Sequence, residues 1–197
     1  MIKVYLFDLD DTLIDTKVYT KLYPKILLLI EKETGLKGSK LDQKARQLKL
    51  KENKAGRWDS GDLCRELGLL DQYYPELEKL IKVVPVLHNR VRFVFNQLRV
   101  KKRRIGIVSN SMRKTIKIYL KKYGLKVDFV FSQDDAGCRK DQNNYWKKLI
   151  KKEKLNPEEC LVIGDDKIED VKIPLKFGFQ TYHLKKPARL KEILALK

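Results

Sequence analysis

An acidic cluster near the start of the chain is the strongest chemical signal in the sequence. Asp8 and Asp10 follow the apolar stretch at residues 1–7, and Thr12 comes two residues later, where its hydroxyl can bond the backbone of the turn. Side chains alternate along an extended chain, so the two carboxylates can point the same way. Neighbouring carboxylates repel and unpaired buried charges are costly, so the pattern indicates a bound cation, a shared proton or both. The alternative is a turn whose acids cap a helix.

The residues around this cluster predict the elements that hold it. Residues 1–7 are rich in β-branched and aromatic side chains and are too few for a helix, which indicates a buried parallel strand. From Lys17 to Val83 the apolar side chains follow helical periodicity alone. This region predicts four short helices, at residues 18–34, 40–53, 59–67 and 75–83.

Beyond Pro85 the predicted helices and strands alternate. The strands are expected at residues 104–109, 128–132, 160–164 and 180–183, and the helices at residues 86–99, 112–123, 143–154, 168–177 and 188–196. Strands separated by helices are typical of a parallel sheet with helices on both faces. We therefore expect an α/β core domain of residues 1–15 and 84–197, with an all-helical domain of residues 16–83 inserted after the first strand.

Polar side chains also follow the other predicted strands of the core. These are Ser109, Asn110 and Ser111 after the second strand, Lys140 in a later loop, and Asp165, Asp166 and Asp170 after the fourth. Parallel α/β sheets bind ligands beyond the carboxyl ends of their strands, so we expect these groups to converge on the acidic cluster. Taken singly, the serine and the aspartates can cap helices, and the lysine can be one more surface charge. Their coincidence at the correct strand ends favours a common site.

The charge of the chain is strongly positive, at +18 over 197 residues. Clustered basic residues would indicate nucleic acid or an anionic membrane as a partner. Here the Lys and Arg residues are spread along almost every predicted helix, so we interpret most of them as solvated faces. The densest tract, residues 101–104, precedes its strand and is therefore expected at the sheet edge opposite the acids.

The cysteines and the apolar runs indicate a cytoplasmic protein. Cys64, Cys138 and Cys160 are odd in number and form no CxxC pair, so neither a disulfide framework nor a zinc site is predicted. The chain enters a strand at its first residues, which leaves no room for a signal peptide. The longest aliphatic run, Ile26–Ile30, is too short to span a bilayer.

In their order along the chain, these motifs resemble those of the haloacid dehalogenase (HAD) superfamily of phosphohydrolases. The four resembling segments are Phe7–Leu13, Ile107–Ser111, Lys140 and Val162–Asp170. The helical insertion also lies where that family carries its helical cap of the first class. The resemblance extends to about Gly178 and implies a Rossmann-like core. One departure is Asp141, which follows the lysine where family members often carry a proline.

The resemblance implies hydrolysis of a small phosphorylated metabolite in two steps. Asp8 would attack phosphorus to give an aspartyl-phosphate, and Asp10 would protonate the leaving oxygen and later activate water. Ser109, Asn110 and Lys140 would bind the phosphate. The lysine would also hold the nucleophile ionised.

The resemblance also implies Mg²⁺ as the cofactor. Magnesium prefers octahedral oxygen ligands, which suits the Asp8 carboxylate, the Asp10 main-chain carbonyl and Asp165. Asp170 would support these ligands. Asp166 is either an alternative ligand or a helix cap.

Three other functions stay open at this point. A 2-haloacid dehalogenase of the same fold releases a halide that needs no proton, so Asp10 favours phosphoester chemistry. A phosphomutase shares Asp8 and Asp10 and differs in how its cap excludes water. A basic nucleic-acid-binding protein on the same scaffold is disfavoured because the acid set is intact.

The loop at residues 54–58 in the helical domain is expected to contact the leaving group of the substrate. Arg57 offers a guanidinium for an anionic group, and Trp58 offers an indole for a ring or an apolar face. The alternative is that the tryptophan anchors the core of the helical domain and the arginine is a solvated surface group. No pattern in the sequence selects one substrate or an oligomeric state.

Overall fold

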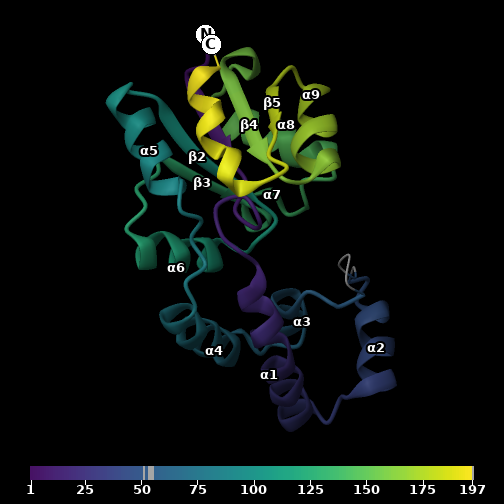
Figure 1. Ribbon diagram of the computed structural model, residues 1–197. Helices are drawn as coiled ribbons and strands as arrows, with labels where there is room; N and C mark the ends of the chain where they lie inside the picture. The colour runs from purple at the N-terminus through teal and green to yellow at the C-terminus, as the bar shows by residue number, and fades with distance from the viewer. Residues whose placement is uncertain (51, 53–55, 197) are drawn as a thin grey trace. The chain divides into compact units, whose positions relative to one another are not determined.

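The computed structural model of the chain describes residues 1–50, 52 and 56–196 (Figure 1). The chain divides into two compact units, one made of Met1–Thr16 and Val86–Lys197 and the other of Lys17–Pro85. The end of the helix predicted at residues 40–53 falls partly outside the described residues, as do Lys54 and Ala55 of the predicted specificity loop.

Five parallel strands form the sheet of the first unit, in the order β3-β2-β1-β4-β5. They are β1 (Val4–Phe7), β2 (Arg104–Ser109), β3 (Phe129–Ser132), β4 (Cys160–Gly164) and β5 (Gln180–His183). All five predicted strands are therefore present. β1 begins at Val4 because its two partner strands begin opposite that residue.

The central strand β1 explains why one edge of the sheet is suited to a site. Phe7 lies opposite Ile107 of β2 and Ile163 of β4. From β1 the sheet extends through β2 to β3 on one side and through β4 to β5 on the other. The carboxyl ends of β1, β2 and β4 therefore meet at the switch point in strand order, where open α/β sheets bind their ligands.

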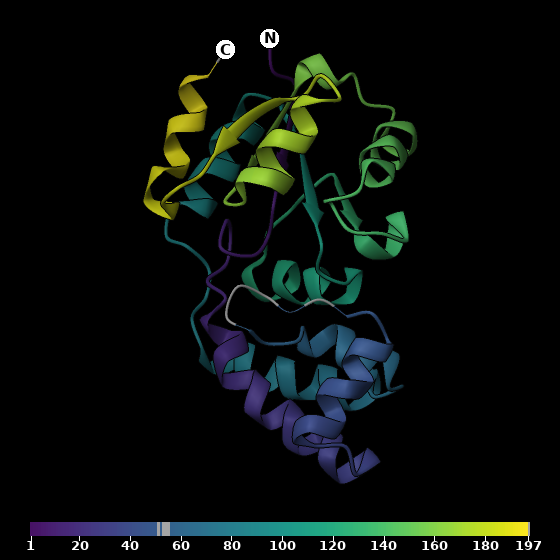
Figure 2. The ribbon, with the colours of Figure 1, turned by 90° about the vertical axis from the view of Figure 1, so that its right-hand side faces the viewer.

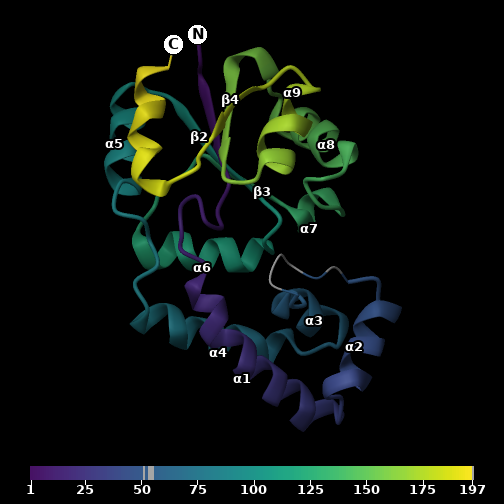
Figure 3. The ribbon, with the colours of Figure 1, turned by 45° about the vertical axis from the view of Figure 1, so that its right-hand side comes forward.

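Helices cover both faces of the sheet (Figure 3). The elements of this unit are α5 (Val91–Val100), α6 (Arg113–Tyr123), α7 (Gln133–Ala136), α8 (Asn143–Glu153), α9 (Ile173–Leu175), the 3₁₀ helices η1 (Pro157–Glu159) and η3 (Pro187–Ala195), and the π-helix η2 (Lys167–Lys172). On one face Phe7 packs against Phe95 of α5, with ring centroids 5.0 Å apart. On the other face, α8 contributes to a chain of edge-to-face rings made by Phe131, Tyr145, Trp146 and Phe179.

The second unit is all-helical (Figure 2). It consists of α1 (Lys17–Thr34), α2 (Gly38–Gln47), α3 (Ser60–Glu66) and α4 (Leu70–Val83). α1 buries apolar side chains spaced four residues apart, namely Val18, Leu22, Ile26 and Ile30. Asp59 caps α3, since its carboxylate accepts the backbone N–H of Asp62 at 2.9 Å.

Two of these helices contain a proline, and the one predicted at residues 75–83 begins earlier than expected. α1 continues through Pro24, and α4 begins at Leu70, five residues before Pro75. A proline inside a helix removes one backbone donor and strains one turn. The long apolar faces of α1 and α4 stay continuous across their prolines, so burial of those faces outweighs the local penalty.

The core helices differ from the prediction at three places. α5 begins at Val91 instead of residue 86, and the short α7 was not predicted. The segment predicted as one helix at residues 168–177 divides into η2 and α9, because Pro174 has no N–H with which to continue the ladder. The last predicted helix is the 3₁₀ helix η3.

The two core segments that flank the helical unit are bonded to each other. Asp15 N–H donates to Val86 O at 2.7 Å, and the N–H of His88 donates to Leu13 O at 3.0 Å. Ile14 and Leu87 form an antiparallel bridge between these contacts. The chain thus leaves and re-enters the core through one paired junction.

No helix within the described ranges is long and apolar enough to cross a membrane. Cys64, Cys138 and Cys160 are free thiols. The cytoplasmic location stays a prediction.

Candidate active site

Asp8 lies at the carboxyl end of β1, where the sheet delivers it to the switch point. Its backbone N–H continues the pairing with β4 by donating to Ile163 O at 2.8 Å. The side chain is buried and is contacted by Lys140, whose Nζ lies 2.5 Å from Asp8 Oδ1 and 2.6 Å from Asp170 Oδ1. Lys140 itself is only 2% exposed. The structure therefore joins three of the predicted site residues through one buried ammonium group.

The charges at this point are not balanced. Burial raises the pKa of the Asp8 carboxyl well above its ordinary value, and Asp170 and Asp10 add to this effect, whereas Lys140 opposes it. Burial by itself would lower the pKa of Lys140, but Asp170 and Asp8 outweigh it and hold that pKa well above the usual range. The lysine is therefore positively charged, and the carboxylates around it remain in excess.

The end of β4 supplies the remaining acids. Asp8, Asp165 and Asp170 each bring a carboxylate oxygen within 4.8 Å of the others. Gly164 makes this approach possible, because a Cβ at that position would lie 2.1 Å from Asp170 Oδ2. Three converging carboxylate oxygens are the donors that a hard divalent cation prefers.

Asp166 is a helix cap in this structure. Its Oδ1 accepts the backbone N–H groups of Ile168 at 2.8 Å and Glu169 at 3.0 Å, which closes the first turn of η2. Asp166 N–H in turn donates to Asp170 Oδ2 at 3.1 Å. Of the two roles expected for Asp166, the cap is the one that the geometry supports.

The end of β2 brings its polar residues into the same site. Ser109 is buried, and its Oγ accepts the backbone N–H of Ser111 at 3.0 Å. Asn110 connects two neighbouring segments, since its Oδ1 accepts the Lys140 N–H at 2.7 Å and its Nδ2 donates to Glu169 Oε2 at 2.5 Å. The amide expected to bind phosphate thus already holds the backbone of the lysine in place.

Three further residues take part for which the sequence predicts no specific role, although Ser111 is expected near the acidic cluster. Ser111 donates its hydroxyl to Asp10 Oδ2 at 2.6 Å. Glu169 holds Asn110, and burial raises its pKa although Lys140 acts against the shift. Tyr145 donates from its hydroxyl toward Phe131 O at 2.9 Å and Ser109 O at 3.2 Å. Ser111 and Glu169 lie inside the motifs that the sequence singled out, whereas only packing identifies the tyrosine.

Thr12 and the two candidate specificity residues lie in different surroundings from those expected. Thr12 is fully buried, and its Oγ1 has no hydrogen-bond partner among the described residues, so the expected bond to the turn is absent there. Trp58 is buried within the helical unit and donates its indole N–H to Asp42 at 2.9 Å. Arg57 is exposed, with its guanidinium 5.6 Å from the centre of the Tyr23 ring. The geometry of Trp58 matches the alternative of a core anchor.

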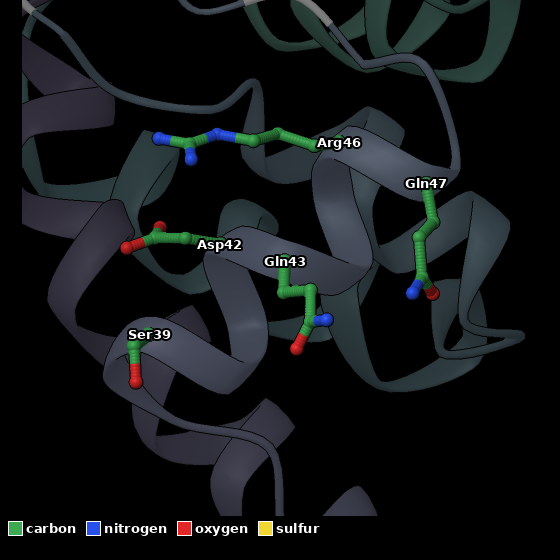
Figure 4. Close-up of a pocket in the computed structure, with 5 residues that line it drawn as sticks. All are labelled: Ser39, Asp42, Gln43, Arg46 and Gln47. Atoms are coloured by element: carbon green, nitrogen blue, oxygen red, sulfur yellow. The ribbon is translucent and has the colours of Figure 1, made fainter.

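A hollow of about 460 Å³ lies beside α2 in the helical unit (Figure 4). It is lined by polar side chains of that one helix, namely Ser39, Asp42, Gln43, Arg46 and Gln47. None of these residues belongs to the motifs predicted from the sequence. The candidate active site is therefore the acid cluster at the sheet edge.

Known proteins resemble this chain in sequence and in fold. The sequence profile of the haloacid dehalogenase-like hydrolases matches residues 2–174. A glyceraldehyde 3-phosphate phosphatase of Methanothermobacter thermautotrophicus is 26% identical over 188 residues, covering 87% of this chain and 80% of its own length.

Two solved structures share the fold at low sequence identity. A HAD phosphatase of Thermococcus onnurineus has a TM-score of 0.69 at 22% identity, covering 98% of each chain. The HAD-hydrolase YfnB of Bacillus subtilis, bound to magnesium and described as revealing interdomain movement, has a TM-score of 0.63 at 18% identity, covering 99% of each chain. With the profile match spanning most of its length, the chain belongs to the haloacid dehalogenase-like hydrolases and is a hydrolytic enzyme.

Proposed function

We propose that the protein is a Mg²⁺-dependent phosphatase that hydrolyses a small phosphomonoester through an aspartyl-phosphate on Asp8. The observation that carries this proposal is the buried Asp8 carboxylate, bonded to Lys140 at 2.5 Å beside a cluster of acids. The names of the relatives from Methanothermobacter and Thermococcus support a phosphatase over a dehalogenase. A triose phosphate is accordingly the first substrate to test.

In the first half-reaction, an Asp8 carboxylate oxygen attacks phosphorus as the bond to the leaving oxygen breaks, and Asp10 gives that oxygen a proton. In the second, water attacks phosphorus, Asp10 takes a proton from it, and the bond between phosphorus and Asp8 breaks to release phosphate. Lys140 has three N–H donors, of which Asp8 and Asp170 take two. The third can bind a phosphoryl oxygen, as can the hydroxyl of Ser109.

The residues of the cluster fit a magnesium ion. Asp8 and Asp165 would hold it through their carboxylates, together with the main-chain carbonyl of Asp10, and Asp170 would stay committed to Lys140. When bound, magnesium neutralises charge on the transferring phosphoryl group. The oxygen-only donor set and the excess of carboxylates support this assignment, and the magnesium in YfnB is consistent with it.

The helical unit at Lys17–Pro85 is proposed to act as a cap that excludes water and contacts the leaving group. Arg57 is the residue of this unit that we retain as a contact for an anionic substrate group. In this proposal Trp58 does not touch the substrate. It holds the segment that carries Arg57 in place, through its buried indole and its bond to Asp42.

The test is a panel of phosphomonoesters assayed for released phosphate, with Mg²⁺ and with a chelator in its place. We expect turnover only with the metal, and loss of turnover in Asp8→Asn. Asp11→Asn is the matched control, because Asp11 is an exposed neighbouring acid whose carboxylate accepts hydrogen bonds from Thr16 and not from Lys140 in the described contacts. Release of phosphate by Asp8→Asn at the wild-type rate would overturn the assignment of the nucleophile, and a phosphorylated product without free phosphate would indicate a phosphomutase.

A further inference from the structure

Ser111 makes a contact that its local structure does not require. Its hydroxyl donates to Asp10 Oδ2 at 2.6 Å, across 101 positions in the sequence and between the ends of two adjacent strands. Such a contact is set by the tertiary fold and not by a turn. It reaches the side chain that the proposed function uses as general acid and base.

The hydroxyl of Ser111 is not used to cap the helix that follows. α6 begins at Arg113 with Met112 as its N-cap, and the Arg113 N–H at this helix start donates to Asp134 Oδ2 at 2.7 Å and not to Ser111. The backbone of Ser111 is held separately, by its N–H bond to Ser109 Oγ at 3.0 Å. The backbone of Ser111 is therefore fixed by its bond to Ser109, and its side-chain hydroxyl donates to Asp10.

A serine at the end of another strand shows what a purely structural contact looks like. Ser132 also donates its hydroxyl to a carboxylate, Asp135 Oδ2, at 2.8 Å. There the backbone N–H of Ser132 donates to the same oxygen at 2.9 Å, and the two residues form the capping box of α7. In the contact of Ser111, by contrast, the backbone N–H of the serine donates to Ser109 Oγ and not to the carboxylate that its hydroxyl contacts.

The geometry points to Ser111 as a positioning residue that holds the Asp10 carboxyl in one orientation for proton transfer to and from the substrate. This inference rests on the proposed function. A hydroxyl offers one donor and two acceptor positions and rotates to suit its partner. It can therefore keep its contact with Asp10 whether the carboxyl has lost or regained its proton, which both half-reactions require.

A comparison of substrates with different leaving groups distinguishes a role in proton transfer from general support of the fold. A good leaving group such as p-nitrophenolate departs without a proton, whereas an alkoxide needs one. We expect Ser111→Ala to lower kcat about tenfold with an alkyl phosphate and less than about threefold with p-nitrophenyl phosphate, with KM nearly unchanged. Ser111→Thr, which keeps the hydroxyl, is expected to restore the alkyl phosphate rate.

Two controls keep the inference testable if Ser111→Ala is less stable. Ser132→Ala is expected to lower the melting temperature without changing the ratio of the two rates. In an Asp10→Asn background, Ser111→Ala is expected to cause no further loss, because the group it positions is already gone.

Equal losses of Ser111→Ala on both substrates, a change confined to KM, or failure of threonine to restore the rate would overturn the inference. An additive loss in the Asp10→Asn background would do the same. A wild-type protein that releases no phosphate from either substrate would instead overturn the proposed function, so the two failures are distinct.

Discussion

Asp8 and Asp135 are both acids beside the carboxyl ends of strands in one sheet, and both contact a lysine. Their surroundings nevertheless shift their pKa values in opposite directions. Burial raises the pKa of Asp135, but its hydrogen bonds with Lys152, Arg113 and Ser132 outweigh burial and set the pKa well below the ordinary value. The pKa of Asp8 lies well above its ordinary value. Asp135 is a satisfied structural carboxylate, whereas Asp8 is held in an excess of negative charge.

The comparison teaches that a basic partner alone does not distinguish an acid of the candidate active site from a structural one. Lys140 serves two carboxylates, while Asp135 receives two basic side chains and two bonds from Ser132. The proposed function accounts for this difference, because a site for a cation and an anionic substrate would keep its charge unbalanced until both bind. In this protein the unbalanced carboxylates lie at the switch point of the sheet, around Lys140.

The largest expected effect comes from replacing each acid by its amide. Asp8→Asn should reduce turnover by at least about 10³-fold and yet raise the melting temperature of the metal-free protein, because it removes a repelled charge. Asp135→Asn should leave turnover within about twofold and lower stability by about 1–3 kcal/mol. Calorimetry and phosphate release on both variants check this pair. A destabilised Asp8→Asn protein would contradict an excess of negative charge around Asp8.

The two lysines sharpen the same contrast. Lys140→Ala should lower kcat/KM at least about tenfold, since it leaves Asp8 and Asp170 facing each other and the phosphate without a cation. Lys152→Ala removes a half-exposed ion pair with Asp135 and should cost less than about 1 kcal/mol with turnover unchanged. Steady-state kinetics and urea unfolding give both quantities. Near-normal kinetics of Lys140→Ala would contradict the proposed phosphate-binding role of Lys140 and point to Arg139, the basic residue next to it in the sequence.

The dependence of stability on pH should report Asp135. Its folded pKa is lowered, so its contribution is fully present above the unfolded value of about 3.9 and is lost as the pH falls through the folded pKa. The difference in unfolding free energy between wild type and Asp135→Asn should therefore be constant near neutral pH and shrink below about pH 4. Urea unfolding with a chelator present, from neutral to acid pH, measures it. A difference that persists unchanged in acid would contradict the low pKa.

The smallest expected effect concerns the helical unit. Arg57→Ala should raise KM about threefold for the best natural substrate and hardly change the kinetics with a small generic phosphoester, because the role proposed for Arg57 is a contact with the leaving group. Lys37→Ala, in an exposed pair with Glu31 in the same unit, is the control. Similar effects on both substrates would remove Arg57 from the site.

Much of the core could be predicted from the sequence because its signals are local. Most strands are short runs rich in apolar residues between turn residues, and Asp8 and Asp165 follow two such runs directly. The order of the strands and the contacts of Asn110 depend on tertiary packing, which no local pattern encodes. The same holds for α4, whose start at Leu70 depends on an apolar face that continues past Pro75.

The roles of individual polar groups were the hardest to predict. Ser111 and Glu169 lie within recognised motifs, but their partners come from other strands. Trp58 is amphipathic, so its sequence position fits a substrate contact and a core anchor equally well. Only its bond to Asp42 and its burial separate the two.

The paired junction between Leu13–Asp15 and Val86–His88 makes the helical unit an exchangeable part of the chain. The bonds across the junction bring the two ends of the insertion together within the core itself. Closing a long loop at such a point becomes only slowly more costly as the loop lengthens. Insertions of different length and sequence can therefore replace Lys17–Pro85 while the core keeps its sheet and the acid cluster at the edge of that sheet, so that evolution or design can exchange the inserted module and retain the core.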